Sequence, residues 1–254
     1  MKGRYVGLAV LVMLTVWVVL STVSFAQAPT ELPPRVIECS PKPFATNVDP
    51  KIQQITITFD RPMNKASAPG FGALRFAGVY PAPMKAQPTW DATGTICSLP
   101  VTLEPDVTYA VAVNSSKQRT FVDDKGIPAL GFAWAFATGE RAAEDFPAYV
   151  VKSDPPLGAK EADFRKQEIT VTFSRPVAPG DFSWVLQRGS GEYPGAREGE
   201  APRLSTDRLT ATLEVRLSPN TVYALGVNDV FYYGYKDIKG RPALPFGLCF
   251  KTAP

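Results

Sequence analysis

The sequence has no histidine at any of its 254 positions. Histidine is the usual general base near neutral pH and the commonest metal ligand in proteins. Its absence therefore excludes Ser-His-Asp and Cys-His catalysis and every metal site built on imidazole. Cysteine and methionine are also scarce, with three and four residues respectively. We accordingly expect no enzymatic activity, no cofactor and no metal centre.

The sequence also lacks an excess of either charge. It carries 27 basic and 24 acidic residues. Lys2 and Arg4 belong to the leader described next, and without them 25 basic residues face 24 acidic ones. Nucleic acids and anionic membrane surfaces select proteins with a strongly basic face, so the balanced charge argues against both as partners.

One long apolar run is present, and it stands at the N-terminus. Residues 1–26 follow the pattern of a signal peptide, with Ser24 and Ala26 placing small side chains before a cleavage site at Gln27. We expect cleavage there and export to the periplasm, the cell surface or the medium, with no stable membrane insertion afterwards. The alternative is an uncleaved anchor, because the stretch from Val6 to Ala26 is just long enough to span a bilayer.

The remaining chain repeats itself with an offset of 114 residues. Residues 36–63 read VIECSPKPFATNVDPKIQQITITFDRPM, and residues 150–177 read VVKSDPPLGAKEADFRKQEITVTFSRPV. The same offset aligns two later pairs of segments, 103–114 with 217–228 and 123–130 with 237–244. Because one register holds from end to end, the sequence predicts a duplicated domain.

The two predicted domains cover residues 35–139 and 149–254. The short polar segment 140–148 between them is expected to act as a linker with limited hinge motion. Inside the repeats, ITITF at 55–59 and ITVTF at 169–173 alternate apolar residues with Thr, which is typical of half-buried strands. Turn-forming Pro, Gly, Asn and Asp fill the gaps, and no stretch has a convincing helical period. About seven short strands in roughly 105 residues predict an antiparallel β-sandwich in each repeat.

The order of motifs in both repeats resembles a known family. An opening apolar strand is followed by Ser-Pro or Asp-Pro, by ITITF or ITVTF with Arg-Pro, by an L.P.T.Y-like segment and by a closing F...F.T strand. This order resembles the bacterial Ig-like domains first described in S-layer proteins of the SbsA type. The resemblance covers nearly the whole chain after the leader. It implies an all-β protein of two tandem Ig-like sandwiches, with no catalytic residues and a structural, adhesive or protein-binding role in the cell envelope.

The largest chemical difference between the repeats lies in one loop. Residues 231–235 read FYYGY where residues 117–121 read KQRTF. Exposed aromatic side chains on a loop stack on sugars or anchor a protein partner. The candidate contacts for an envelope protein or polysaccharide are Phe231, Tyr232, Tyr233 and Tyr235. We expect at least two of them to be exposed; the alternatives are a carbohydrate-binding accessory protein using this loop, or aromatics that pack on their own sheet edge or the neighbouring repeat.

The cysteines supply a second hypothesis. Cys39 and Cys97 share strand parity with core residues, so we expect both to face one core and consider them a candidate disulfide. The alternative is two buried free thiols. Cys249 shares parity with Lys251 and is therefore expected to face outward.

Three aspartates stand in patterns that are typical of turns. Asp123, Asp124 and Asp237 stand in D..G patterns before strands. These patterns are turn signatures first, and calcium ligands only as an alternative, because a calcium site needs six to eight oxygens.

Overall fold

The computed structural model describes residues 29–67, 69–83, 87–196 and 201–254, and the expected signal peptide lies outside them. Over these ranges the chain is all-β, with antiparallel strand pairs and one short 3-10 helix, η1 (Ala143–Asp145). The strands of the first half, residues 29–139, are β1 (Val36–Ser40), β2 (Gln54–Phe59), β3 (Phe71–Ala73), β4 (Thr89–Trp90), β5 (Ile96–Pro100), β6 (Thr108–Val113) and β7 (Phe132–Ala137). Those of the second half, residues 149–254, are β8 (Val150–Asp154), β9 (Glu168–Phe173), β10 (Trp184–Leu186), β11 (Gly195–Ala196), β12 (Arg203–Leu204), β13 (Thr210–Arg216), β14 (Val222–Val227) and β15 (Phe246–Lys251).

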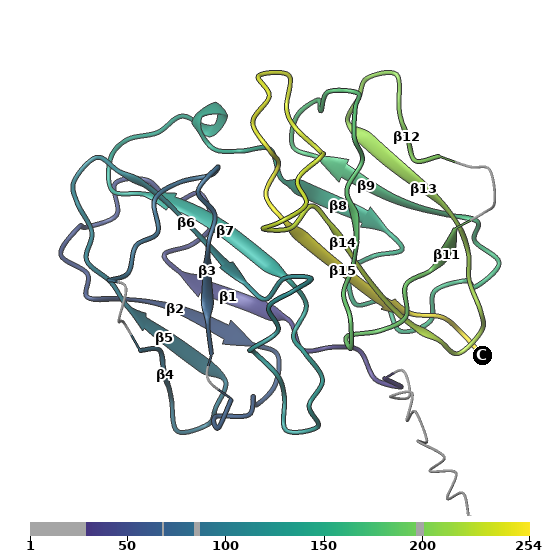
Figure 1. The fold of residues 1–254 in the computed structure, drawn as a ribbon, viewed down its shortest axis with the longest axis horizontal. Helices are drawn as coiled ribbons and strands as arrows, with labels where there is room; N and C mark the ends of the chain where they lie inside the picture. The colour runs from purple at the N-terminus through teal and green to yellow at the C-terminus, as the bar shows by residue number, and fades with distance from the viewer. Residues whose placement is uncertain (1–28, 68, 84–86, 197–200) are drawn as a thin grey trace, which may run out of the picture.

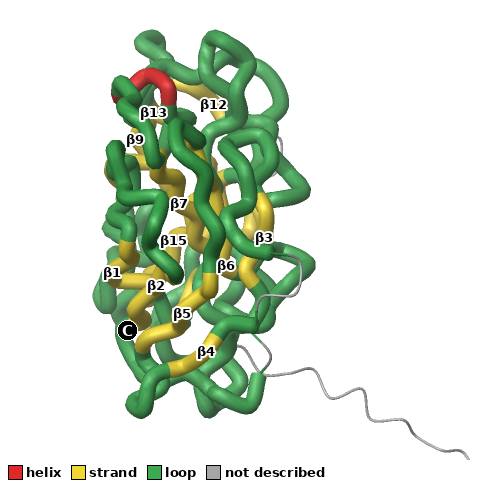
Figure 2. The backbone as a smooth tube through the Cα atoms, turned by 90° about the vertical axis from the view of Figure 1, so that its left-hand side faces the viewer, coloured by secondary structure: helices red, strands yellow, loops and turns green. Residues whose placement is uncertain are grey.

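The described strands form three sheets (Figure 1). One sheet has the order β1-β2-β5-β4, a second has the order β11-β13-β9-β8 with β12 paired to β13, and the third has the order β10-β14-β15-β7-β6-β3. In the side view, β1, β2, β5 and β4 lie in one layer and β6 and β3 in another (Figure 2). The third sheet therefore takes strands from both halves of the chain.

Strand pairing follows the same register in the two halves. Val36 pairs with Phe59 between β1 and β2, and Val150 pairs with Phe173 between β8 and β9. The alternation of apolar residues and Thr in β2 places every second side chain, such as Ile57, in the core and leaves the Thr side chains at intermediate exposure. Each half thereby encloses its own apolar core between two sheets.

The shared sheet is buried on both of its faces. In β6 and β7, large residues such as Tyr109 and Trp134 point into the first core, while Ala110 and Ala135 occupy the opposite face and are also fully buried. That second face contacts Leu244 and Phe146, which come from the second half and from the segment that leads into it. β6 and β7 thus direct large residues into the first core and alanines toward the segments that cover their other face.

The segment 140–148, expected to act as a linker, packs against the fold. Phe146 is buried on the shared sheet, and its ring lies 5.4 Å from that of Phe44. The Arg175 guanidinium donates hydrogen bonds to the carbonyls of Glu144 and Phe146, at 3.1 and 3.0 Å. The sequence of segment 140–148 is mostly polar, and the one large apolar residue in it, Phe146, makes its contact with the shared sheet.

Candidate functional site

Two features stand out, namely the aromatic loop and the junction between the halves.

The loop follows β14, and the Asp229 side chain fixes its shape. Asp229 Oδ1 accepts hydrogen bonds from the N–H groups of Phe231 and Tyr232, at 2.6 and 2.7 Å. Its other oxygen, Oδ2, accepts the N–H of Ser116 at 2.9 Å. A single buried carboxylate therefore holds the loop in a turn and ties it to the first half.

Three of the four predicted aromatic residues are exposed. The exposed fractions are 46% for Phe231, 50% for Tyr232 and 43% for Tyr233. The prediction that at least two would be exposed is confirmed. We call these three residues the aromatic triplet.

Tyr235 corrects the prediction for the fourth residue, because it is fully buried in the core of the second half. Its ring lies 5.3 Å from those of Phe173 and Phe182. The equivalent residue 114 positions earlier is Phe121, which is also fully buried. Burial raises the pKa of the Tyr235 hydroxyl above its usual range. Tyr235 belongs to the scaffold, and the aligned Phe121 was the signal for this in the sequence.

The aromatic triplet is partly supported by the first half. Lys117 Nζ lies 4.5 Å from the centre of the Phe231 ring and 5.4 Å from that of Tyr232, which is cation–π geometry. The ring of Tyr233 lies 5.3 Å from that of Phe76. The triplet therefore contacts the other half, as one alternative proposed, and still leaves nearly half of each residue open to solvent.

A shallow groove of about 460 Å³ adjoins Tyr232. It runs beside β10, which is the last strand at its end of the shared sheet as described. The residues that line the groove are Ser116, Lys117, Trp184, Val185, Leu186, Arg188 and Tyr232. Two cations and no carboxylate therefore stand among its lining side chains.

The junction between the halves is the second feature. β7 and β15 pair antiparallel through Phe132 and Phe246, which are 114 residues apart. Beyond this pair each strand bonds to a segment of its own half, as the N–H of Phe44 does to the Ala135 carbonyl at 2.7 Å. At the equivalent place in the second half, the N–H of Gly158 bonds to the Cys249 carbonyl at 2.7 Å.

At the junction, residues that are 114 positions apart pack reciprocally, each on the half of the chain to which the other belongs. Leu130 lies in a buried cluster with Ala224 and Cys249 of the second half, and Leu32 packs against it. The residues 114 positions away from Leu130 and Leu32 are Leu244 and Phe146, and both lie in the cluster on the alanine face of β6 and β7. Each half thus places a leucine and its leading segment on the other half.

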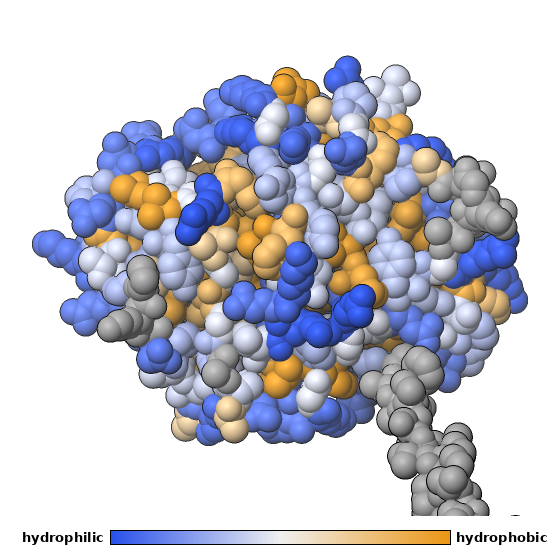
Figure 3. Space-filling view, viewed as in Figure 1, coloured by the Kyte–Doolittle hydropathy of each residue, from blue (hydrophilic) through white to orange (hydrophobic). Residues whose placement is uncertain are grey.

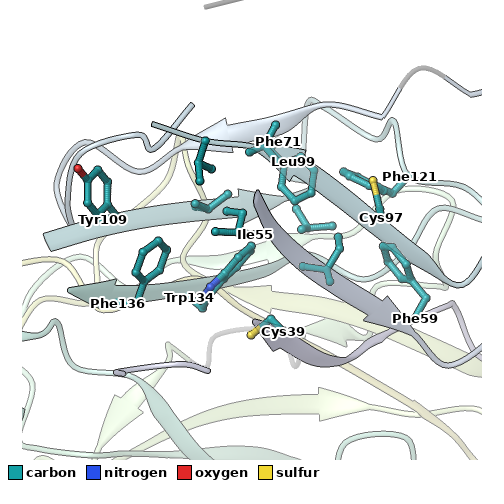
Figure 4. Packing of buried hydrophobic residues seen from close by; sticks show 14 of the residues in the cluster. Cys39, Ile55, Phe59, Phe71, Cys97, Leu99, Tyr109, Phe121, Trp134 and Phe136 are labelled. Atoms are coloured by element: carbon teal, nitrogen blue, oxygen red, sulfur yellow. The ribbon is translucent and has the colours of Figure 1, made fainter. Parts of the chain in front are cut away.

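The candidate disulfide is not formed. Cys39 and Cys97 both lie in the first core, as predicted, and both are free thiols. Ile57 of β2 pairs with Cys39 on one side and with Cys97 on the other, so the two cysteines are separated by a strand. Two strand spacings amount to roughly 9–10 Å, which is beyond the Cα separation of about 7 Å that a disulfide tolerates. Figure 4 shows the two sulfur atoms apart in the packed core.

Cys249 corrects the prediction from strand parity. It faces away from the core of its own half, as parity requires, but the first half covers that face and the residue is fully buried. Burial raises the pKa of the Cys39, Cys97 and Cys249 thiols to about 12.

Two of the three aspartates, Asp123 and Asp237, serve as turn residues. Asp123 Oδ1 accepts the N–H groups of Lys125 and Ile127, and Asp237 Oδ1 accepts those of Lys239 and Arg241, all at 2.9–3.0 Å. Burial alone would raise the pKa of Asp237, but these N–H groups and the Arg241 guanidinium lower it below its usual value. Within the described ranges, no three acidic or sulfur side chains gather as a metal site.

On the face drawn in Figure 3, apolar side chains reach the surface in patches among hydrophilic ones, several of them near the middle of the molecule. No helix in the described part of the chain is both long enough and apolar enough to cross a bilayer.

Comparison with known proteins finds a family for the first half. A family model described as bacterial Ig-like domain matches residues 30–138. No curated protein matches the chain.

Solved structures give only distant likenesses. Two are S-layer structures, "Structure of surface layer protein SbsC, domains 1-6" at 12% identity and "Crystal structure of the S-layer protein rSbsC(31-844)" at 14%. Each has a TM-score of 0.27 and covers 87% of this chain, which spans about a quarter, 26%, of either S-layer chain. A third, "Crystal structure of Dpr2 Ig1-Ig2 in complex with DIP-Theta Ig1-Ig3", has 10% identity and a TM-score of 0.27 over 87% of this chain and 98% of that one. The assignment rests instead on the family match and the antiparallel all-β fold, which together support placing residues 30–138 among the bacterial Ig-like domains.

Proposed function

We propose that this chain is a non-catalytic, exported protein of the cell envelope that binds another envelope protein through the aromatic triplet. The observation that carries the proposal is the exposure of Phe231, Tyr232 and Tyr233 on a loop that Asp229 holds in one shape. The family match of the first half fits a structural or binding role. The expected signal peptide supports export.

The proposal includes a duplicated Ig-like module. Recurrent details with the 114-residue offset support it. Asn114 donates hydrogen bonds to the carbonyls of Phe121 and Ala129 at 2.9 and 2.8 Å, and Asn228 donates to the residues 114 positions later, both at 2.9 Å. The Tyr109 hydroxyl accepts the N–H of Glu104 at 2.6 Å, and that of Tyr223 accepts the N–H of Ser218 at 2.7 Å. Such tyrosine bonds to upstream backbone are a recurring feature of Ig-like sandwiches.

The binding role follows from the difference between the two modules. Equivalent strands of a duplicated module need equivalent core residues, so a scaffold requirement would appear in both copies. The second copy keeps that requirement in Tyr235, yet it adds three aromatics where the first copy has Lys117, Gln118 and Arg119. Large apolar groups left at a surface favour contact with a partner, since their burial releases water. Aromatic residues are also the commonest anchors of protein interfaces.

The test is retention of the exported chain on envelope extract of the cells that make it. The double variant Phe231→Ser/Tyr232→Ser should lose most binding while its melting temperature stays within a few degrees of the unmodified chain. A matched control is Ile238→Ser, because Ile238 is a single exposed apolar residue, at 70%, outside the triplet. Equal retention of the double variant and the control would rule out the triplet as the contact.

A carbohydrate ligand is the second candidate, and the groove beside Tyr232 favours it. An exposed ring next to Lys117 and Arg188 suits an anionic polysaccharide, whose sugar rings stack on aromatic faces. Digesting the extract with protease before the experiment separates the two candidates. Binding that disappears on digestion supports the protein partner, and binding that persists supports the polysaccharide.

A further inference from the structure

The junction between the halves contains an apolar pocket of about 230 Å³. It arises because a single residue pair joins β7 to β15, after which each strand turns to its own half for hydrogen bonds. The wedge between the separating strands is lined by equivalent residues from both halves. They are Phe132 and Phe246, Leu130 and Leu244, and Val36 and Val150.

Two exposed apolar residues lie at or beside this pocket. Val151 is more than half exposed and lines a neighbouring groove with three residues of this pocket, Val150, Leu157 and Phe246. Leu157 lines the pocket and also reaches the surface. A pocket of mostly apolar lining at the junction of the two halves has the character of a small-molecule site.

The lining offers no unpaired charge, which indicates an uncharged ligand. Arg35 is the one charged residue among the lining side chains. Its Nε already contacts the Asp60 carboxylate at 3.3 Å, and its Nη1 donates to the Leu157 carbonyl at 3.5 Å. An anionic ligand would compete with Asp60 and would be repelled by it, so the pocket offers no free charge of either sign.

The aromatic side chains in the lining indicate an aromatic ligand. Four of the lining residues carry rings, namely Phe44, Phe132, Tyr149 and Phe246. The Phe44 and Tyr149 rings stack with centres 4.3 Å apart. Rings pack favourably on rings in stacked or edge-on arrangements. A cavity of roughly 150 Å³ accommodates benzene, so the larger pocket has room for a bicyclic ring.

We propose that the junction pocket binds a small, uncharged aromatic molecule of about the size of naphthalene or indole. This site shares no residue with the aromatic triplet and goes beyond the proposed function. Binding here would hold the two halves together, because the ligand would contact equivalent residues of each.

The experiment titrates the full-length chain with naphthalene and with indole, using calorimetry and the amide signals of Gly131 and Gly247 in NMR spectra. Both glycines line the pocket. We expect saturable binding of one equivalent, with shifts at these two amides and none at residues 231–233. Naphthalene-2-sulfonate, which adds a negative charge to the same ring, should bind at least tenfold more weakly.

A pair of variants localises the binding. Leu157→Trp places a larger side chain over the pocket from an exposed position and should weaken naphthalene binding at least tenfold. Ile238→Trp, a matched exposed position that does not line the pocket, should leave binding within twofold. If Leu157→Trp impairs folding, Val150→Phe replaces it, and the amide shifts of the unmodified chain decide the matter independently.

Three results would overturn the proposal. They are the absence of saturable binding, equally tight binding of the sulfonate, and shifts that avoid Gly131 and Gly247. If both proposals hold, the Phe231→Ser/Tyr232→Ser variant loses partner binding but binds naphthalene as tightly as the unmodified chain does. The two assays therefore distinguish failure of one proposal from failure of the other.

Discussion

Phe132 and Phe246 occupy the same place in the two halves of the chain, 114 residues apart, and they pair with each other across the junction of β7 and β15. Residues that match under this offset contact each other, as equivalent residues do at the axis of a two-fold interface. The reciprocal placement of Leu130 and Leu244 has the same geometry. The halves therefore contact each other as the subunits of a symmetric dimer do, within one chain.

The first prediction concerns this symmetry. Leu130→Ala and Leu244→Ala each remove a buried side chain from equivalent positions, and each should lower the free energy of unfolding by about 2–4 kcal/mol. The two losses should agree within about 1 kcal/mol, and both variants should melt in one transition, because the junction couples the halves. Denaturant titration measures both quantities. Separate transitions for the two halves would show that the junction is weak.

The second prediction concerns Tyr235. In the described structure its buried hydroxyl makes no hydrogen bond of good geometry, although the Trp184 indole is its polar neighbour. An unpaired buried hydroxyl costs about 1–3 kcal/mol, and Phe121 fills the equivalent place. Tyr235→Phe should therefore leave stability unchanged or raise it. A loss of more than about 1 kcal/mol in a thermal melt would reveal a bond that this account omits.

Strand pattern alone predicted much of the fold, but not the covering of the shared sheet. The alternation in ITITF and ITVTF placed Ile57 and its equivalents correctly in the cores. Parity also gave Cys249 the correct face of its strand, yet it could not show that another part of the chain covers that face. The signal was present in residues 132–137, which alternate large residues with Ala rather than with Thr or Lys. Small residues at every second place indicate a face that something else must cover.

The candidate site was partly predictable for a similar reason. Comparison of the repeats identified the unusual loop, since FYYGY replaces KQRTF there. It did not separate Tyr235 from the triplet, although Phe121 already stood at the aligned place. The contacts of Lys117 and Phe76 with the triplet arise only when the halves meet, and no local pattern carries that information.

The third prediction concerns the thiols. Burial raises the pKa of Cys39, Cys97 and Cys249 to about 12, so the reactive thiolate is scarce at pH 8. A thiol reagent should therefore label none of the three in the native chain and all three after unfolding. Electrophoretic mobility should not change with reductant, because no disulfide links Cys39 and Cys97. Rapid native labelling of Cys249 would show that the halves separate at the junction.

The fourth prediction concerns acid. The Thr93 hydroxyl and the Ile96 N–H lower the pKa of Asp91 from 3.8 to about 2, and hydrogen bonds lower that of Asp237 in the same direction. A carboxyl group whose pKa is lower in the folded state stabilises the fold above its unfolded pKa, and this contribution disappears as the pH falls through the folded value. Stability should therefore decline between about pH 4 and pH 2.

The variant Asp91→Asn checks that assignment. It should be less stable than the unmodified chain at neutral pH and should lose less stability on acidification. Melting temperatures at several pH values give the comparison, with Glu161→Gln as a surface control. An unchanged slope below pH 4 in Asp91→Asn would assign the acid sensitivity to other groups.

The central claim is that the aromatic triplet contacts a partner, and site-directed photo-crosslinking tests it most directly. A photoreactive amino acid is placed at position 232 or, as the matched exposed control, at position 238, and the exported chain is irradiated with envelope extract. The account predicts a crosslinked protein from position 232, at roughly ten times the yield obtained from position 238, and its loss when Phe231→Ser is added. Equal yields at the two positions, or a product from position 238 alone, would contradict it.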